Sequence, residues 1–251
     1  MLFPPTVTSA LAPKGVLRVG VNMSNFLLVS SRGPRGEPRG VVPDLAERLA
    51  SDLDLQLELH LFPNPGALGD AVDSDVWDVA FLGSEPARAA TIAFTQPYAE
   101  IEATYLVPAG SRLSSVAEVD APGVRVAVSQ RAAYECWLTD NLRRATLLRT
   151  AEPGLALSRE LFLREGCDAL AGLRPWLLTQ AESLEGATVL DGRFSSVQQA
   201  VGVPRSRADG GATMHLERWV EEQKASGLVA SLIEEHGVRG KLTVAERCTT
   251  R

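Results

Sequence analysis

The spacing of leucines changes abruptly between residues 45 and 61. Leu45, Leu49 and Leu53 recur every four residues, which places them along one face of a helix. The four leucines between residues 55 and 61 recur at every second position, which is typical of a strand with one buried face. A helix followed directly by a strand is the repeating unit of an open α/β sheet.

The same alternation of strands and helices extends over most of the chain. Residues 15–21 alternate as a strand before the leucine helix, and a helix over 66–73 and a strand over 78–82 complete a first β-α-β-α-β unit. A second unit has a similar layout, and a long helical region near the C-terminus is broken at Ser226–Gly227. The segments predicted for this second half are strand 123–129, helix 132–144, strand 145–150, helix 153–165 ending at Gly166, strands 167–172 and 187–191, and helices over 212–236.

Two further strands connect the two α/β units. They are predicted over residues 103–110 and 197–204. We therefore expect an α/β fold with two Rossmann-like lobes joined by a two-strand hinge, and the cleft between the lobes would be the natural pocket. The expected boundaries are 15–104 with 204–240 for lobe 1, 105–203 for lobe 2, and 1–14 and 241–251 for the tails.

Charge and hydrophobicity argue against a nucleic-acid partner and against membrane insertion. The 31 acidic and 25 basic residues give a net charge of −6, which argues against a nucleic-acid partner because such a partner requires a basic face. No apolar run approaches the ~20 residues that span a bilayer, so no membrane insertion is expected. Residues 1–15 lack a charged segment followed by an unbroken apolar one, so no secretory leader is recognised. Either a leader has been removed or the protein stays in the cytoplasm.

No cofactor or metal is predicted. The three cysteines, Cys136, Cys167 and Cys248, are widely spaced and form no CxxC pair, which argues against a disulfide framework and against a zinc site. The three histidines show no metal-ligand spacing, and the chain contains no Walker A motif, dinucleotide fingerprint or GxSxG motif.

One segment, DVAFLGSEPARAATIAFTQPY at residues 78–98, carries the main functional signal. A buried-strand pattern over 79–82 stops at a polar turn, and Arg88 follows six residues after Leu82. This pattern fits a plain loop before a helix. It also fits an anion-recognition site at the carboxyl end of a strand, where open α/β sheets bind ligands.

Together with GVVPDLAERLA (40–50) and GVRVAVSQRAAYE (123–135), this segment resembles the type 2 periplasmic solute-binding proteins, specifically the amino-acid-binding family 3 of ABC importers. The resemblance implies a periplasmic binding protein-like fold of type 2 and a non-enzymatic role. The protein would bind a small carboxylate-bearing solute, an amino acid or a related organic acid, in the cleft between the lobes. An ABC permease would be its partner, and the periplasm its location.

The resemblance also implies a set of ligand-binding residues in lobe 1. Arg88 stands six residues before Phe94 of the pattern [IV]-x-F-[ST]-x-P-Y, as does the family's arginine that holds the ligand carboxylate. Gly83 and Ser84 occupy a loop that offers backbone and hydroxyl groups to the ligand, although this loop is shorter than in many relatives. Candidates from the loop after the first strand are Asn22, Asn25 and Phe26, with turn formation as the alternative for the asparagines.

Lobe 2 departs from the family pattern at two positions. Relatives carry Ser or Thr at the start of the first helix of this lobe, where this chain has Ala132 and Ala133, although the backbone N–H groups of the helix can still bind an anion. Leu173 stands where relatives carry the aspartate that receives the ligand's ammonium. Glu85 or Glu135 would then replace that aspartate, or the ligand has no α-amino group. The neighbouring Arg174, beside Pro175, is expected to be solvated.

Two other functions remain open at this stage. One is an enzyme similar to the cyclohexadienyl dehydratases, in which Glu85 or Glu135 would act as the acid or base. The other is a cytoplasmic ligand sensor.

Overall fold

The computed structural model describes residues 3–208 and 211–246. The chain divides into two compact units: Met1–Glu100 with Gln198–Arg251 form unit 1, and Ile101–Val197 form unit 2. It passes from one unit to the other twice, in β7 (Ala99–Val107) and in β12 (Ser195–Pro204). Residues 105 and 203, the boundaries expected for lobe 2, fall inside these two strands. The α/β class predicted from the hydrophobic pattern is confirmed.

In unit 1, β1 (Val16–Asn22) is the central strand of a mainly parallel sheet. It pairs in parallel with β4 (Gln56–Phe62) on one side and with β5 (Val79–Gly83) on the other. Strand β12 is antiparallel to β5 and also pairs with β6 (Ile92–Phe94). The chain therefore leaves β1 toward one side of the sheet and returns to the opposite side as β5. This reversal makes the carboxyl ends of β1 and β5 a topological switch point.

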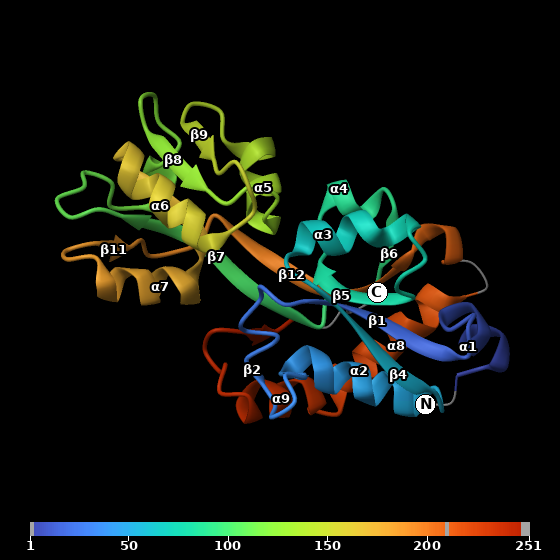
Figure 1. The fold of residues 1–251 in the computed structure, drawn as a ribbon. Helices are drawn as coiled ribbons and strands as arrows, with labels where there is room; N and C mark the ends of the chain where they lie inside the picture. Colours follow the sequence, from blue (N-terminus) through green and yellow to red (C-terminus); the bar gives the residue numbers. More distant parts are fainter. Residues whose placement is uncertain (1–2, 209–210, 247–251) are drawn as a thin grey trace. The chain divides into compact units, whose positions relative to one another are not determined.

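Helices cover both faces of this sheet (Figure 1). Leu45 and Leu49 of α2 (Val41–Asp52) are fully buried, which confirms the leucine stripe. On the other face, Leu68 of α3 (Pro65–Asp70) packs against Trp77 in a separate hydrophobic cluster. The C-terminal helices of the unit are α8 (Ala212–Ala225) and α9 (Leu228–Glu235). The helical region is broken at Gly227, as the sequence predicts, because this glycine adopts a left-handed conformation with a φ of +80°.

Unit 2 repeats the same topology. Strand β8 (Arg125–Val128) lies between β9 (Thr146–Arg149) and β10 (Ala169–Leu173), in parallel with both, and β7 is antiparallel to β10. The chain leaves β8 toward β9 on one side and returns to the opposite side of β8 as β10. The carboxyl ends of β8 and β10 therefore form the switch point of this unit.

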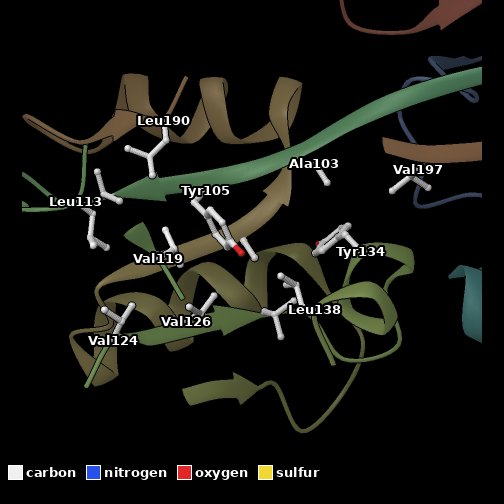
Figure 2. Close-up of a cluster of buried hydrophobic side chains, with 14 residues drawn as sticks. Ala103, Tyr105, Leu113, Val119, Val124, Val126, Tyr134, Leu138, Leu190 and Val197 are labelled. Atoms are coloured by element: carbon white, nitrogen blue, oxygen red, sulfur yellow. The ribbon is translucent and has the colours of Figure 1, made fainter. Parts of the chain in front are cut away.

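The unit 2 sheet is also covered on both faces. Tyr134 and Leu138 of α5 (Ala133–Asn141) pack with Tyr105 of β7 in one hydrophobic cluster (Figure 2). On the opposite face, residues of α6 (Leu155–Glu165) and α7 (Arg174–Ser183) pack in a second cluster. Helix α6 ends at Gly166 with a φ of 58°, as the sequence predicts.

Several elements were not anticipated from the sequence. Part of the expected N-terminal tail forms α1 (Pro5–Leu11), whose Val7 and Leu11 are buried. Helix α7 begins directly after β10, and Pro175 lies in its first turn, where a missing N–H costs nothing. The other unpredicted short elements are β2 (Ser31–Arg32), β3 (Pro38–Arg39), α4 (Pro86–Ala89), β13 (Thr243–Val244), and 3₁₀ turns at Val116–Glu118 and Arg205–Arg207. Strand β11 (Thr188–Val189) lies within the strand predicted over 187–191, and a 3₁₀ turn at Ala71–Asp73 lies at the end of the helix predicted over 66–73.

A buried ion network fixes the amino end of β5. The Asp78 side chain is fully buried and accepts hydrogen bonds from Nε and Nη2 of Arg18, at 2.8 and 2.6 Å. Nη2 of Arg18 also lies 2.9 Å from Asp75, and Nη2 of Arg207 donates to the Trp77 carbonyl at 2.7 Å. The hydrogen bond with Asp78 raises the pKa of Arg18 above its ordinary value. Arg18 therefore stays charged, and its buried guanidinium requires the Asp78 carboxylate.

Substituting Asp78→Ala should lower the free energy of unfolding by about 3–5 kcal/mol, because the buried Arg18 guanidinium loses its carboxylate. Urea denaturation at pH 7 measures this change. Glu234→Ala is the control, because Glu234 pairs with Arg239 on the surface, and it should cost less than about 1 kcal/mol. Equal stabilities of the two variants would contradict a structural role for the buried pair.

The exposed carboxylate of this network should make stability depend on acid pH. Hydrogen bonds from Lys14 and then Arg18 lower the pKa of Asp75 from its ordinary 3.8 to about 2. Because the folded pKa is the lower one, this stabilisation is complete above pH 3.8 and is lost as the pH falls to about 2. In Asp75→Asn, which tolerates the positive φ of 53° at this position, the free energy of unfolding should fall less steeply over this range. The free energy of unfolding is measured by urea denaturation at several pH values. If it falls with pH equally steeply in wild type and variant, Asp75 does not contribute.

Candidate functional site

The predicted residues of lobe 1 gather at the switch point of unit 1. Asn22 is the last residue of β1, and Gly83 is the last residue of β5, its hydrogen-bonded neighbour. Asn25 and Phe26 follow in the turn after β1. The topology therefore brings two loops that are far apart in sequence to adjacent positions, where open α/β sheets bind ligands.

Both asparagines stabilise the turn after β1. The Asn22 side-chain oxygen accepts hydrogen bonds from the backbone N–H and hydroxyl of Ser24, at 3.1 and 2.9 Å. The Asn25 side-chain oxygen accepts one from the Leu27 N–H at 3.2 Å. Turn formation, the alternative weighed for both residues, is therefore what the structure shows. Phe26 is 37% exposed and presents an apolar ring on the surface of unit 1.

The loop after β5 is held by backbone bonds. Gly83 pairs with Gln199 of β12, and the N–H and hydroxyl of Ser84 donate to the Gln198 carbonyl at 2.9 and 3.4 Å. Glu85 then precedes α4, and Pro86 occupies the first helical position. The chain is thus fixed immediately before the residues that carry charge.

Arg88 and Glu85 form a nearly buried ion pair. Nη1 of Arg88 lies 2.7 Å from Oε2 of Glu85 and donates to the Gly83 carbonyl at 3.2 Å. The exposed fractions of the two side chains are 12% and 9%. The Arg88 side chain also lies beside α3. A Cβ atom added at Gly69 of this helix would be 3.5 Å from the Nε of Arg88, which is ordinary van der Waals contact. The guanidinium is therefore held in place by a local network rather than solvated on a loop.

Arg205 holds the carboxyl end of α4, and this role is not predicted from the sequence. Its Nε donates to the Ala89 carbonyl at 3.1 Å, and its backbone N–H donates to the Thr91 carbonyl at 2.8 Å. Arg205 follows β12, more than a hundred residues later in the chain. No local pattern could have linked it to the Arg88 segment.

The predicted residues of lobe 2 lie at the switch point of unit 2. Ala132 precedes α5 without making a side-chain cap, and Ala133 begins the helix. Both alanines, together with Leu173 at the end of β10, pack against the hydrophobic cluster around Tyr105. Their side chains therefore serve packing in this structure.

Glu135, the second carboxylate considered as an ammonium partner, is held inside unit 2. Its Oε1 accepts from Nε of Arg149 at 2.6 Å and from the Thr139 hydroxyl at 2.9 Å. Its Oε2 accepts from the Arg131 N–H at 3.3 Å. These contacts, together with its place in the first turn of α5, give this carboxylate a structural role.

The expectation that Arg174 is solvated is wrong. Its Nε donates to Glu102 at 2.7 Å and its Nη1 donates to the Leu190 carbonyl at 3.3 Å. Glu102 lies 72 residues earlier in the chain, so the pair depends on the pairing of β7 with β10. Proximity of Arg174 to Pro175 in sequence carries no information about this partner.

Neither a metal site nor a membrane span is found in residues 3–208 and 211–246. Within these ranges, no group of three or more His, Cys, Asp and Glu side chains could hold a metal ion. No helix there combines the length and the apolar character needed to cross a membrane. Cys136 and Cys167 form no disulfide there, and Cys248 lies outside the described residues.

Several solved structures share this fold. The chain is similar to AbpA, an amino acid ABC transporter substrate-binding protein from Streptococcus pneumoniae bound to L-arginine, with 21% identity, a TM-score of 0.70, and 91% of this chain and 97% of that chain covered. A solute receptor for L-cysteine of Neisseria gonorrhoeae is 20% identical, with a TM-score of 0.73 and coverage of 95% and 99%. The ancestral amino acid-binding protein AncCDT-1, a precursor of cyclohexadienyl dehydratase, is also 20% identical, with a TM-score of 0.70 and coverage of 91% and 97%.

These similarities establish the α/β fold of the type 2 periplasmic binding proteins. No curated protein sequence matches the chain at a significant level. Residues 17–238 match the model of one family, the bacterial extracellular solute-binding proteins, family 3. The chain therefore belongs to family 3 of the bacterial extracellular solute-binding proteins.

Proposed function

We propose that this protein binds a small carboxylate-bearing solute, an amino acid or a related organic acid, with Arg88 as the anchor for the carboxylate. The observation that carries the proposal is the position of Arg88. Its guanidinium is fixed at the switch point of unit 1 and is only 12% exposed. Amino-acid ligands in relatives of the same fold, L-arginine in AbpA and L-cysteine in the Neisseria receptor, support the ligand class.

The chemistry of an arginine suits this task. Its planar fork forms two parallel hydrogen bonds with a carboxylate, which gives geometric specificity as well as affinity. Glu85 and the Gly83 carbonyl already hold the side chain, so a ligand would lose little affinity to the ordering of this group. Asn22, Asn25, Phe26 and Ser84 are the other proposed contacts from unit 1. The contributions of Ala132, Ala133 and Leu173 stay predictions.

Membership of family 3 supports a role in transport. Its members are described as bacterial extracellular proteins, so we propose that this one acts outside the cytoplasm and delivers its ligand to an ABC permease. A cytoplasmic sensor would use the same binding chemistry without that partner. Cell fractionation of the native host separates these two roles.

A dehydratase is the second candidate, because a variant of the ancestral cyclohexadienyl dehydratase AncCDT-3 shares the fold at 21% identity and a TM-score of 0.52. Such an enzyme needs a carboxyl group that exchanges a proton with its substrate. Glu85 and Glu135, the two carboxylates considered for this role, each pair with an arginine in the structure. We therefore propose binding rather than catalysis.

Substituting Arg88→Ala should weaken ligand binding by about 2–5 kcal/mol, the usual cost of removing one partner of a buried charge pair. Arg88→Lys should also bind poorly, because an ammonium cannot form the two parallel hydrogen bonds. A thermal-shift screen of amino acids and small carboxylates supplies the ligand, since a ligand at a hundred times its Kd stabilises the protein by ~2.7 kcal/mol. Calorimetry then measures the affinities.

The control for this series is Arg239→Ala, which removes an arginine from an exposed ion pair in the same unit. Thermal melts confirm that each variant is folded at the temperature of the calorimetry. Wild-type affinity in a folded Arg88→Ala variant would exclude Arg88 from the site.

A further inference from the structure

We infer that Glu85 and Arg88 form a charge-neutral pair that selects zwitterionic ligands, which carry an ammonium beside their carboxylate, over simple carboxylates. This inference rests on the proposed function and specifies its ligand class. The two charged groups stand three residues apart, and their atoms lie 2.7 Å from each other. Both side chains are about nine-tenths buried, so their charges are weakly screened by solvent.

A ligand carboxylate that approaches Arg88 also approaches Glu85. Two carboxylates around one guanidinium repel each other, and the repulsion is strong where water is scarce. Because Arg88 and Glu85 together carry no net charge, the pair also gives no long-range attraction to an anion. A simple carboxylate therefore gains the hydrogen bonds of Arg88 but bears an uncompensated charge.

An α-amino acid removes this difficulty. Its ammonium stands one carbon away from its carboxylate, so one ligand can place a positive charge near Glu85 and a negative charge near Arg88. Every buried charge then has an opposite neighbour, which is the condition for burying charges at low cost. The pair therefore offers one opposite charge to each of the two charges of an amino-acid head group.

The other positions considered for the ammonium do not offer this match. Leu173 is apolar and packs against a hydrophobic cluster. Glu135 is a carboxylate, but Arg149, Thr139 and the Arg131 N–H already contact its two oxygens. Glu85 is the carboxylate that adjoins the proposed anchor.

The test compares three probes on the wild-type protein. They are the standard L-amino acid that gives the largest thermal shift, its des-amino acid and its carboxamide; for leucine these are L-leucine, 4-methylpentanoate and L-leucinamide. The des-amino acid lacks the ammonium, and the carboxamide lacks the carboxylate. Each should bind at least roughly tenfold more weakly than the amino acid, because each leaves one buried charge without its partner.

Glu85→Gln then reverses the preference. Glutamine keeps the size of the side chain and an oxygen that can accept from Arg88, but it removes the negative charge. The amino acid should lose at least roughly tenfold in affinity, and the des-amino acid should bind more tightly than to wild type. The readout is the ratio of two affinities on the same variant, so a change in overall stability does not imitate the effect.

Two further variants complete the series. Glu234→Gln neutralises an exposed glutamate of unit 1 and should leave the ratio unchanged. Glu135→Gln tests the rival carboxylate, and loss of the preference in this variant instead of in Glu85→Gln would overturn the inference. If Glu85→Gln shows no cooperative thermal transition, the wild-type comparison of the three probes decides alone.

The inference and the proposed function fail in different ways. If the des-amino acid binds wild type as tightly as the amino acid, and Arg88→Ala abolishes both, carboxylate binding stands and selection by Glu85 is wrong. If no amino acid and no carboxylate binds wild type, the proposed function itself is wrong.

Discussion

A buried charge is stable only beside an opposite charge, and this constraint applies at both ends of β5. Every residue of β5 is buried. Asp78 immediately precedes the strand and pairs with Arg18, and Glu85 follows it closely and pairs with Arg88. Sliding or fraying at the amino end would separate Asp78 from Arg18 of β1, which would cost several kcal/mol. The carboxyl end is held by the backbone pairing of Gly83 and Ser84 with β12. The loop that carries the proposed site therefore continues directly from a strand that is held at both ends.

The regular elements follow from local patterns, whereas the unpredicted ones depend on distant contacts. The leucine spacing predicts α2 and β4, and the left-handed conformations at Gly166 and Gly227 explain why the helices stop where a glycine stands. Helix α7 was missed because Arg174 and Pro175 suggested a solvated strand end. Its first residue is held by Glu102, 72 residues away, a contact that only the folded sheet creates.

The candidate site shows the same division. The motif around Arg88 indicates an anion site, and the spacing of Glu85 and Arg88 by three residues is a local signal for an ion pair. Their surroundings are not local, because Arg88 lies beside Gly69 of α3, and Arg205 after β12 donates to the Ala89 carbonyl at the end of α4. The sequence alone shows that Leu173 stands where relatives carry an aspartate. Only the structure shows that Glu135 forms an ion pair with Arg149.

The most direct test of the account is a crystal structure of the wild-type protein with the amino acid found by the thermal-shift screen. A carboxylate oxygen of the ligand should lie about 2.7–2.9 Å from a guanidinium nitrogen of Arg88, as in other charge-assisted hydrogen bonds. Its ammonium should face Glu85. A ligand held by other residues, with Arg88 making only its contacts within unit 1, would contradict the central claim.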